Sequence, residues 1–238
     1  MGARLGRWAV LGGAVLALCA ARADARREFA DAFDADISSK TWRCETLRGR
    51  RWRVEAGELV SQPVVDRKGL GDPGNVLLDV VTRRKDFQDF ELLCDIRFDT
   101  QGSHKDHRVI YFRTAEAGAA EPVGYEVHIA VWLPFPDPGH YLKFRRRNAD
   151  GSVTSLTPFV EYPWVLERWY RVRLAAAGHK FNLKIWPREE NEPDAWTLTA
   201  SDPAALYEKG GVGFGNYWGA VTRVDNVRVI PLDGGPRP

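Results

Sequence analysis

The stretch from Asp86 to Ile129 constrains the fold most, because its segments alternate apolar and polar residues. In Phe90–Phe98, one face carries only apolar residues at every second position, and the other carries Glu91, Asp95 and Arg97. Side chains of a strand point alternately to opposite faces of the sheet. The pattern therefore predicts strands with one face for a core and one for water or a ligand.

Much of the remaining chain repeats this pattern in short segments separated by turn residues. The predicted strands are 51–60, 76–82, 90–98, 108–114, 125–132, 141–147, 169–175, 181–186, 211–214 and 223–231. Residues 147–151, Arg-Asn-Ala-Asp-Gly, are typical of a hairpin turn. Because no helices alternate with these strands, we predict an all-β fold, an antiparallel two-sheet β-sandwich of the jelly-roll type.

The N-terminal residues resemble an export signal. Two arginines precede an apolar run, which ends in the small-x-small sequence Ala21-Arg22-Ala23. The run is too short to be a typical membrane span. We therefore predict a signal peptide at 1–23, a single domain at 24–238 with no membrane span, and a secreted or periplasmic location.

The overall charge gives no sign of a polyanion partner. The chain has 34 basic and 32 acidic residues, a formal net charge of +2. Removing residues 1–23 takes away Arg4, Arg7 and Arg22 and leaves 31 basic residues against the same 32 acidic ones. We expect no nucleic-acid partner, and we expect a monomer.

Two cysteines remain after the predicted cleavage, Cys44 and Cys94. An oxidising compartment favours a disulfide between them. Cys94, however, lies on the apolar face of its strand, as a buried free thiol does. Both interpretations stay open at this stage.

An ordered series of short motifs resembles the concanavalin A-like jelly-roll superfamily, in its laminin-G-like and 3-keto-disaccharide-hydrolase-like bacterial branches. The matching residues are Phe33-Asp34, Trp52-Arg53-Val54, Asp89-Phe90-Glu91-Leu92, Tyr111-Phe112-Arg113, Gly124-Tyr125-Glu126, Trp169-Tyr170-Arg171-Val172-Arg173, Trp186-Pro187, Glu192-Pro193, Trp196, Gly211-Val212-Gly213-Phe214 and Asp225-Asn226-Val227. The resemblance implies a concanavalin A-like fold, which hosts lectins, binding modules, hydrolases and lyases. The chain lacks the paired carboxylate strand of laminarinase-type relatives.

The polar face of the central strands is the predicted binding site for carbohydrate. Aromatic rings stack on sugar rings, and charged side chains form strong hydrogen bonds to hydroxyl groups. The alternative is a solvated face of cross-strand ion pairs, such as Glu126 with Arg113 or Lys143. The predicted carbohydrate-binding residues are Tyr111, Arg113, Glu126, His128, Trp132, Lys143, Arg145 and Trp218.

The resemblance also implies an enzymatic alternative, a glycoside hydrolase or lyase acting on a 3-keto-disaccharide. Glu126 or His128 would then be the general base, and Arg113 would stabilise the enolate-like oxygen. A second alternative is a protein-interaction module that uses the same face. Residues 132–140, Trp-Leu-Pro-Phe-Pro-Asp-Pro-Gly-His, would form one wall of the groove opposite Trp218.

A structural calcium ion is the one cofactor suggested. Related jelly-roll modules tie their first and last strands together through aspartates, and Asp31, Asp34 and Asp225 match those positions. Calcium needs six to eight oxygen ligands, of which these residues supply only part. The cluster of His104, Asp106 and His107 has the composition of a solvated loop, so we do not assign a metal there.

Overall fold

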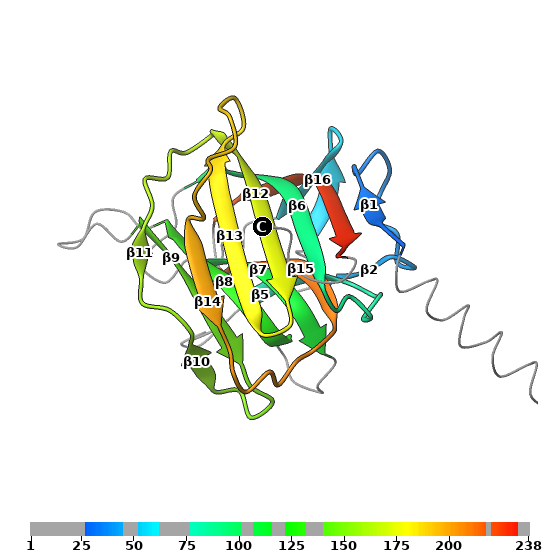
Figure 1. The fold of residues 1–238 in the computed structure, drawn as a ribbon. Coiled ribbons are helices and arrows are strands. Elements are labelled where there is room, and N and C mark those ends of the chain that lie inside the picture. The colour runs from blue at the N-terminus through cyan, green and yellow to red at the C-terminus, as the bar shows by residue number, and fades with distance from the viewer. Residues whose placement is uncertain are drawn as a thin grey trace, which may run out of the picture.

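A computed structural model describes residues 27–44, 52–61, 77–100, 107–115, 122–131, 140–217 and 220–232. These residues form two antiparallel sheets that lie face to face, and they contain no helix (Figure 1). The predicted two-sheet β-sandwich is confirmed. The predicted signal peptide lies outside the described residues. Within the described ranges, no helix has the length and apolar character needed to cross a membrane.

Sheet A is the front layer in Figure 1, and its strands run in the order β14-β13-β12-β6-β16-β4-β3, with β1 also paired to β16. Chain-distant strands are therefore neighbours, and the long central strand β6 lies between β12 and β16. The strands of sheet A are β1 (Phe29–Asp31), β3 (Trp52–Glu55), β4 (Glu58–Ser61), β6 (Phe90–Phe98), β12 (Trp169–Ala177), β13 (Lys180–Pro187), β14 (Leu198–Ser201) and β16 (Thr222–Pro231).

Sheet B is the layer behind, in the order β10-β9-β8-β7-β15-β5-β2, with β11 also paired to β9. The three predicted segments that carry the candidate binding residues, 108–114, 125–132 and 141–147, form neighbouring strands of this sheet. Its strands are β2 (Trp42–Cys44), β5 (Leu77–Thr82), β7 (His107–Ala115), β8 (Val123–Val131), β9 (His140–Arg147), β10 (Val153–Ser155), β11 (Val160–Glu161) and β15 (Gly211–Tyr217).

The core lies between the sheets and is built from the apolar face of each alternating strand. On β6 this face is Phe90, Leu92, Cys94, Ile96 and Phe98, all buried, as the alternation predicts. Tyr125, Val127 and Ile129 of β8 meet it from sheet B. Because successive side chains alternate, Glu126 and His128 must point to the outside of sheet B.

Two turns show how local residues set the hairpins. Gly151 has a φ of 82°, and the amide of Asn148 donates to the carbonyl of Ser152, so the predicted turn between β9 and β10 is confirmed. The predicted strand 51–60 is instead the hairpin β3–β4. Ala56 and Gly57 both have positive φ values, 52° and 79°, which turn the chain back between the two strands.

Strand β7 contains a bulge that breaks its alternation. The register with β8 shifts between Phe112 and Ala115, and Arg113 has a φ of 49°. A Cβ added to Gly124 on β8 would lie 2.7 Å from the carbonyl oxygen of Arg113, so only glycine fits beside the bulge. A bulge reverses the side to which the following residues point, which matters for the site.

Candidate functional site

The candidate site is the outer surface of sheet B, which we call the polar face. It consists of the side chains of β5, β7, β8 and β9 that point away from the core. Its polar and aromatic residues include Asp79, His107, Tyr111, Glu126, His128, Tyr141, Lys143, Arg145 and Arg147. The strand register places the sequence-predicted residues Tyr111, Glu126, His128, Lys143 and Arg145 together on this surface.

Glu126 lies at the centre of the polar face, opposite Tyr111 on β7 and Arg145 on β9. It is 1% exposed. Its Oε1 lies 2.5 Å from Nη2 of Arg145, and its Oε2 lies 3.8 Å from Nη2 of Arg147. These contacts are ion pairs without hydrogen-bond alignment, and neither oxygen has a hydrogen-bond partner among the described residues. A buried carboxylate with this acceptor capacity can take hydroxyl donors.

His128 lies two residues further along β8 and is 2% exposed. Burial lowers the pKa of His128 well below its ordinary value, and electrostatic repulsion from Arg145, His107 and Lys143 lowers the pKa further. The imidazole is therefore neutral at pH 7, with one donor and one acceptor nitrogen. Within the described part of the chain, neither nitrogen has a hydrogen-bond partner. Buried polar atoms normally find partners, so this ring is suited to a bound molecule.

Tyr111 and Asp79 form a polar pair across β15. The Tyr111 hydroxyl donates to Oδ1 of Asp79 at 3.0 Å, and both side chains are buried. The strand between them carries Gly215 at this level, where an added Cβ would lie 2.8 Å from the Tyr111 hydroxyl oxygen and from Oδ1 of Asp79. The glycine in β15 thus leaves the space in which the two side chains meet.

A row of rings crosses the strands beside these charges. The centroids of His107 and His128 are 4.3 Å apart, those of His128 and Tyr141 are 5.8 Å apart, and those of Tyr141 and Phe159 are 4.2 Å apart. Phe159 lies between β10 and β11 and is 58% exposed. The row thus runs from β7 across β8 and β9 to an exposed aromatic side chain at the edge of the sheet.

The predicted placement of Arg113 on this face is wrong. The bulge in β7 turns its side chain toward the end of sheet A, where Nε donates to the carbonyl of Gln88 at 2.8 Å and Nη1 to that of Gly178 at 2.6 Å. Nη2 pairs with Asp89 at 3.0 Å. The buried guanidinium therefore links β7 to the turn between β12 and β13, and it does not belong to the polar face with Glu126 and His128.

The remaining predicted groove residues, Trp132 and Trp218, lie outside the described residues, as do His104 and Asp106. Their roles stay predictions. Sequence reasoning missed Asp79, Tyr141 and Phe159 and assigned His107 to a loop. An aspartate inside the apolar segment 76–82 was an available signal for Asp79, and Tyr141 shares the parity of Lys143.

The disulfide alternative is not supported, because the structure shows no disulfide between Cys44 and Cys94. Cys94 belongs to the core side of β6 in sheet A, and burial raises its pKa far above the ordinary value, so it stays protonated. Cys44 lies in sheet B and lines a cleft of about 340 Å³ with Trp42 and Trp52. The two thiols are therefore in different environments on opposite sheets.

The three aspartates proposed for calcium do not form a ligand set. Both Asp31 oxygens accept hydrogen bonds from the protein, from the Phe33 amide at 2.9 Å and from Nε1 of Trp42 at 2.8 Å. Asp225 accepts from the amide and the side chain of Asn226. Among the described residues, no group of three or more histidine, cysteine or acidic side chains could hold a metal ion. The described residues therefore show no calcium ligand set at these positions, and a calcium site in this protein stays a prediction.

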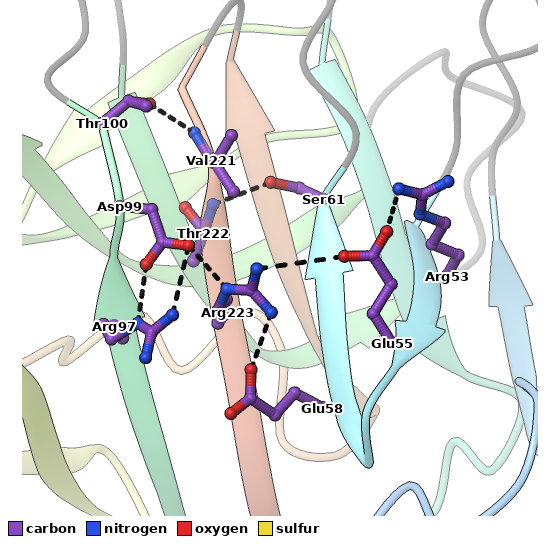
Figure 2. Close-up of polar contacts among 10 residues, drawn as sticks. All are labelled: Arg53, Glu55, Glu58, Ser61, Arg97, Asp99, Thr100, Val221, Thr222 and Arg223. Atoms are coloured by element: carbon purple, nitrogen blue, oxygen red, sulfur yellow. Dashed lines mark hydrogen bonds and ion pairs between the residues drawn. The ribbon is translucent and has the colours of Figure 1, made fainter. Parts of the chain in front are cut away.

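The outer face of sheet A differs from the polar face because its charges are matched (Figure 2). Arg223 donates to Oδ2 of Asp99 at 2.5 Å and to Oε2 of Glu58 at 2.8 Å, and Arg97 pairs with Asp99 at 2.6 Å. Burial raises the pKa of Asp99, but hydrogen bonds from Arg97 and Arg223 outweigh it and hold the pKa below its usual value. This network is a satisfied, partly exposed surface.

No family model and no curated protein sequence matches the chain. Solved structures do. The carbohydrate-binding module CBM66 from Bacillus subtilis aligns with a TM-score of 0.57 at 16% identity, covering 82% of this chain and 99% of the module. The exoplasmic/lumenal domain of VIP36, in a Ca²⁺/Man2-bound form, aligns with a TM-score of 0.60 at 7% identity, over 90% of each chain.

The glucanase SCLam, a non-specific endo-β-1,3(4)-glucanase from family GH16, aligns with a TM-score of 0.56 at 14% identity, covering 84% of this chain and 89% of the enzyme. At these identities the likeness shows the fold alone. The fold is the concanavalin A-like jelly roll, as the sequence motifs predict.

Proposed function

We propose that this chain is a carbohydrate-binding protein that holds its glycan on the polar face of sheet B. The buried and incompletely hydrogen-bonded pair Glu126–His128 is the observation that carries the proposal. Sugars present many hydroxyl groups, each of which donates one hydrogen bond and accepts others. A carboxylate that only accepts, beside an imidazole that donates and accepts, is complementary to such a ligand.

The row of rings supports the same function. Sugar rings have apolar faces that pack on aromatic side chains, and the row from His107 to Phe159 lies beside Glu126, Arg145 and Lys143. Apolar stacking and oriented polar groups thus occur on one surface, as in ligand sites generally. Two of the structural neighbours support this choice by name, one as a carbohydrate-binding module and one in a form with Man2 bound.

We favour binding over turnover of a 3-keto-disaccharide. That alternative used Arg113 to stabilise an oxyanion, and the Arg113 guanidinium bonds the carbonyls of Gln88 and Gly178 instead. A neutral His128 can act as a base, but without Arg113 this mechanism lacks the group that was predicted to stabilise the oxyanion. We further propose export through the predicted signal peptide, which places the binding face in a secreted or periplasmic protein.

The test is calorimetric titration with oligosaccharides selected on a glycan array. His128→Phe keeps a ring in the aromatic row and removes both nitrogens, so we expect about tenfold weaker binding, the cost of about one hydrogen bond. His179→Phe, an exposed histidine between β12 and β13, is the matched control and should bind as the native protein does. Unchanged affinity in His128→Phe, or no glycan bound by the native protein, would contradict the proposal.

A further inference from the structure

The edge of sheet B at β9 brings an exposed aromatic ring and an ammonium group together. Nζ of Lys143 lies 4.2 Å from the centroid of the Phe159 ring, and Tyr141 packs on the same ring. Phe159 is 58% exposed, one of four large apolar side chains that are exposed among the described residues. An exposed ring beside polar groups can pack on the apolar face of a sugar whose hydroxyl groups bond those polar groups.

Within the described part of the chain, no carboxylate lies within ion-pair distance of Lys143, although the charge of Glu126 acts on it from further away. Its Nζ lies 3.5 Å from the hydroxyl of Ser155, a weak contact that leaves hydrogen-bond donors of the ammonium available. The neighbouring cation on the same face, Arg145, is already matched by Glu126 at 2.5 Å. Of these two cations, Lys143 is therefore the one whose positive charge a ligand can neutralise.

On the basis of the proposed function, we propose that this edge is a subsite for an acidic sugar. The sugar ring packs against the exposed part of Phe159, and its negatively charged substituent forms an ion pair with Lys143. The neutral hydroxyl groups of the same ligand then extend along the row of rings toward His128. A carboxylate, as in a uronic acid, and a sulfate ester both have the required charge and acceptor oxygens.

The ring and the cation contribute in different ways, which makes them separable. Stacking on Phe159 depends on apolar area and is insensitive to salt, whereas the ion pair at Lys143 is partly exposed and is screened by salt. An acidic glycan should therefore lose affinity as ionic strength rises, and a neutral glycan of equal length should not.

The experiment titrates the full chain with three oligosaccharides of matched length: an oligogalacturonate, which carries carboxylates and no sulfate, a carrageenan oligosaccharide, which carries sulfate esters and no carboxylate, and neutral maltohexaose. We expect at least one acidic ligand to bind about tenfold more tightly than the neutral one, which corresponds to one charge-assisted hydrogen bond. The two acidic ligands distinguish a carboxylate from a sulfate. Raising the salt concentration should remove most of the difference.

Two variants and a control complete the test. Lys143→Gln should bring acidic and neutral affinities to the same level, and Phe159→Ala should weaken both. Lys180→Gln changes an exposed lysine on β13 of sheet A and should change neither. Equal binding of acidic and neutral ligands by the native protein, with no effect of Lys143→Gln, would overturn the acidic subsite and leave the proposed function standing. Absence of binding to any glycan would overturn both.

Discussion

The outer faces of the two sheets use the same types of residue in opposite ways. On sheet A, the side chains of Arg223 and its carboxylate partners Asp99 and Glu58 are 18–25% exposed, and the contacts between them are short ion pairs that are also hydrogen bonds (Figure 2). On sheet B, Glu126 and His128 are almost fully buried, and they keep unused hydrogen-bond capacity. The charged residues therefore do not by themselves distinguish the two faces, whereas buried polar atoms that lack hydrogen bonds occur at Glu126 and His128 of the polar face.

The largest expected effect belongs to neither face. Arg113→Met removes a buried guanidinium that bonds two carbonyls and Asp89, so we expect a loss of about 3–5 kcal/mol in the free energy of unfolding. Urea unfolding followed by tryptophan fluorescence measures it. If the variant also lost glycan affinity under conditions where it is fully folded, Arg113 would have to belong to the site after all.

A smaller loss of stability is expected on sheet A. Arg223→Met leaves Asp99 with Arg97 as its partner and Glu58 near the surface, so we expect a cost of about 1 kcal/mol. Glycan affinity should be unchanged, because the network lies on the opposite sheet. Urea unfolding and calorimetric titration of this variant give the two values, and a binding defect here would remove the contrast between the faces.

On sheet B the pH dependence of stability should report His128. Its pKa is lowered in the folded state, so above about pH 6.5 the imidazole is neutral in both states and has no effect. As the pH falls below that value, the unfolded chain takes up the proton first, and the folded state loses stability. The slope can reach about 1.4 kcal/mol per pH unit for one group.

Unfolding at pH 7 and pH 5 in native protein and in His128→Phe isolates this contribution, since the two proteins differ only at this residue. The native protein should lose more stability than the variant. The same slope in both proteins would mean that Arg145, Lys143 and His107 do not disfavour the imidazolium, contrary to the packing of the polar face.

The smallest expected effect is that of a chelator. Because Asp31 already accepts two hydrogen bonds from the protein, we expect the melting temperature to stay the same with and without EDTA. Differential scanning calorimetry in calcium-containing and chelated buffers makes the comparison. A lower melting temperature in EDTA would show a calcium site built from other residues.

The sequence predicted the site as far as its alternation held. Glu126 and His128 share a face because nothing interrupts β8, and the same rule placed Lys143 and Arg145 on β9. It failed at Arg113, because a positive φ at that residue changes the direction of its side chain, and alternation cannot show a bulge. The row of rings could not be predicted from the sequence either, because it depends on the strand register that places Tyr141 opposite Ala130.

The bulge in β7 changes which side chains of this strand point to the core, and the amino-acid sequence of the strand does not show this change. Gly124 and Gly210 press against it so closely that a methyl group on either would collide with the backbone of Arg113 or Thr114. Without the bulge, the side chains of β7 would alternate without interruption, and the Arg113 guanidinium would lie on the polar face. An insertion or deletion in this short stretch can therefore change which side chains of β7 lie on the polar face while Glu126 and His128 on β8 stay the same.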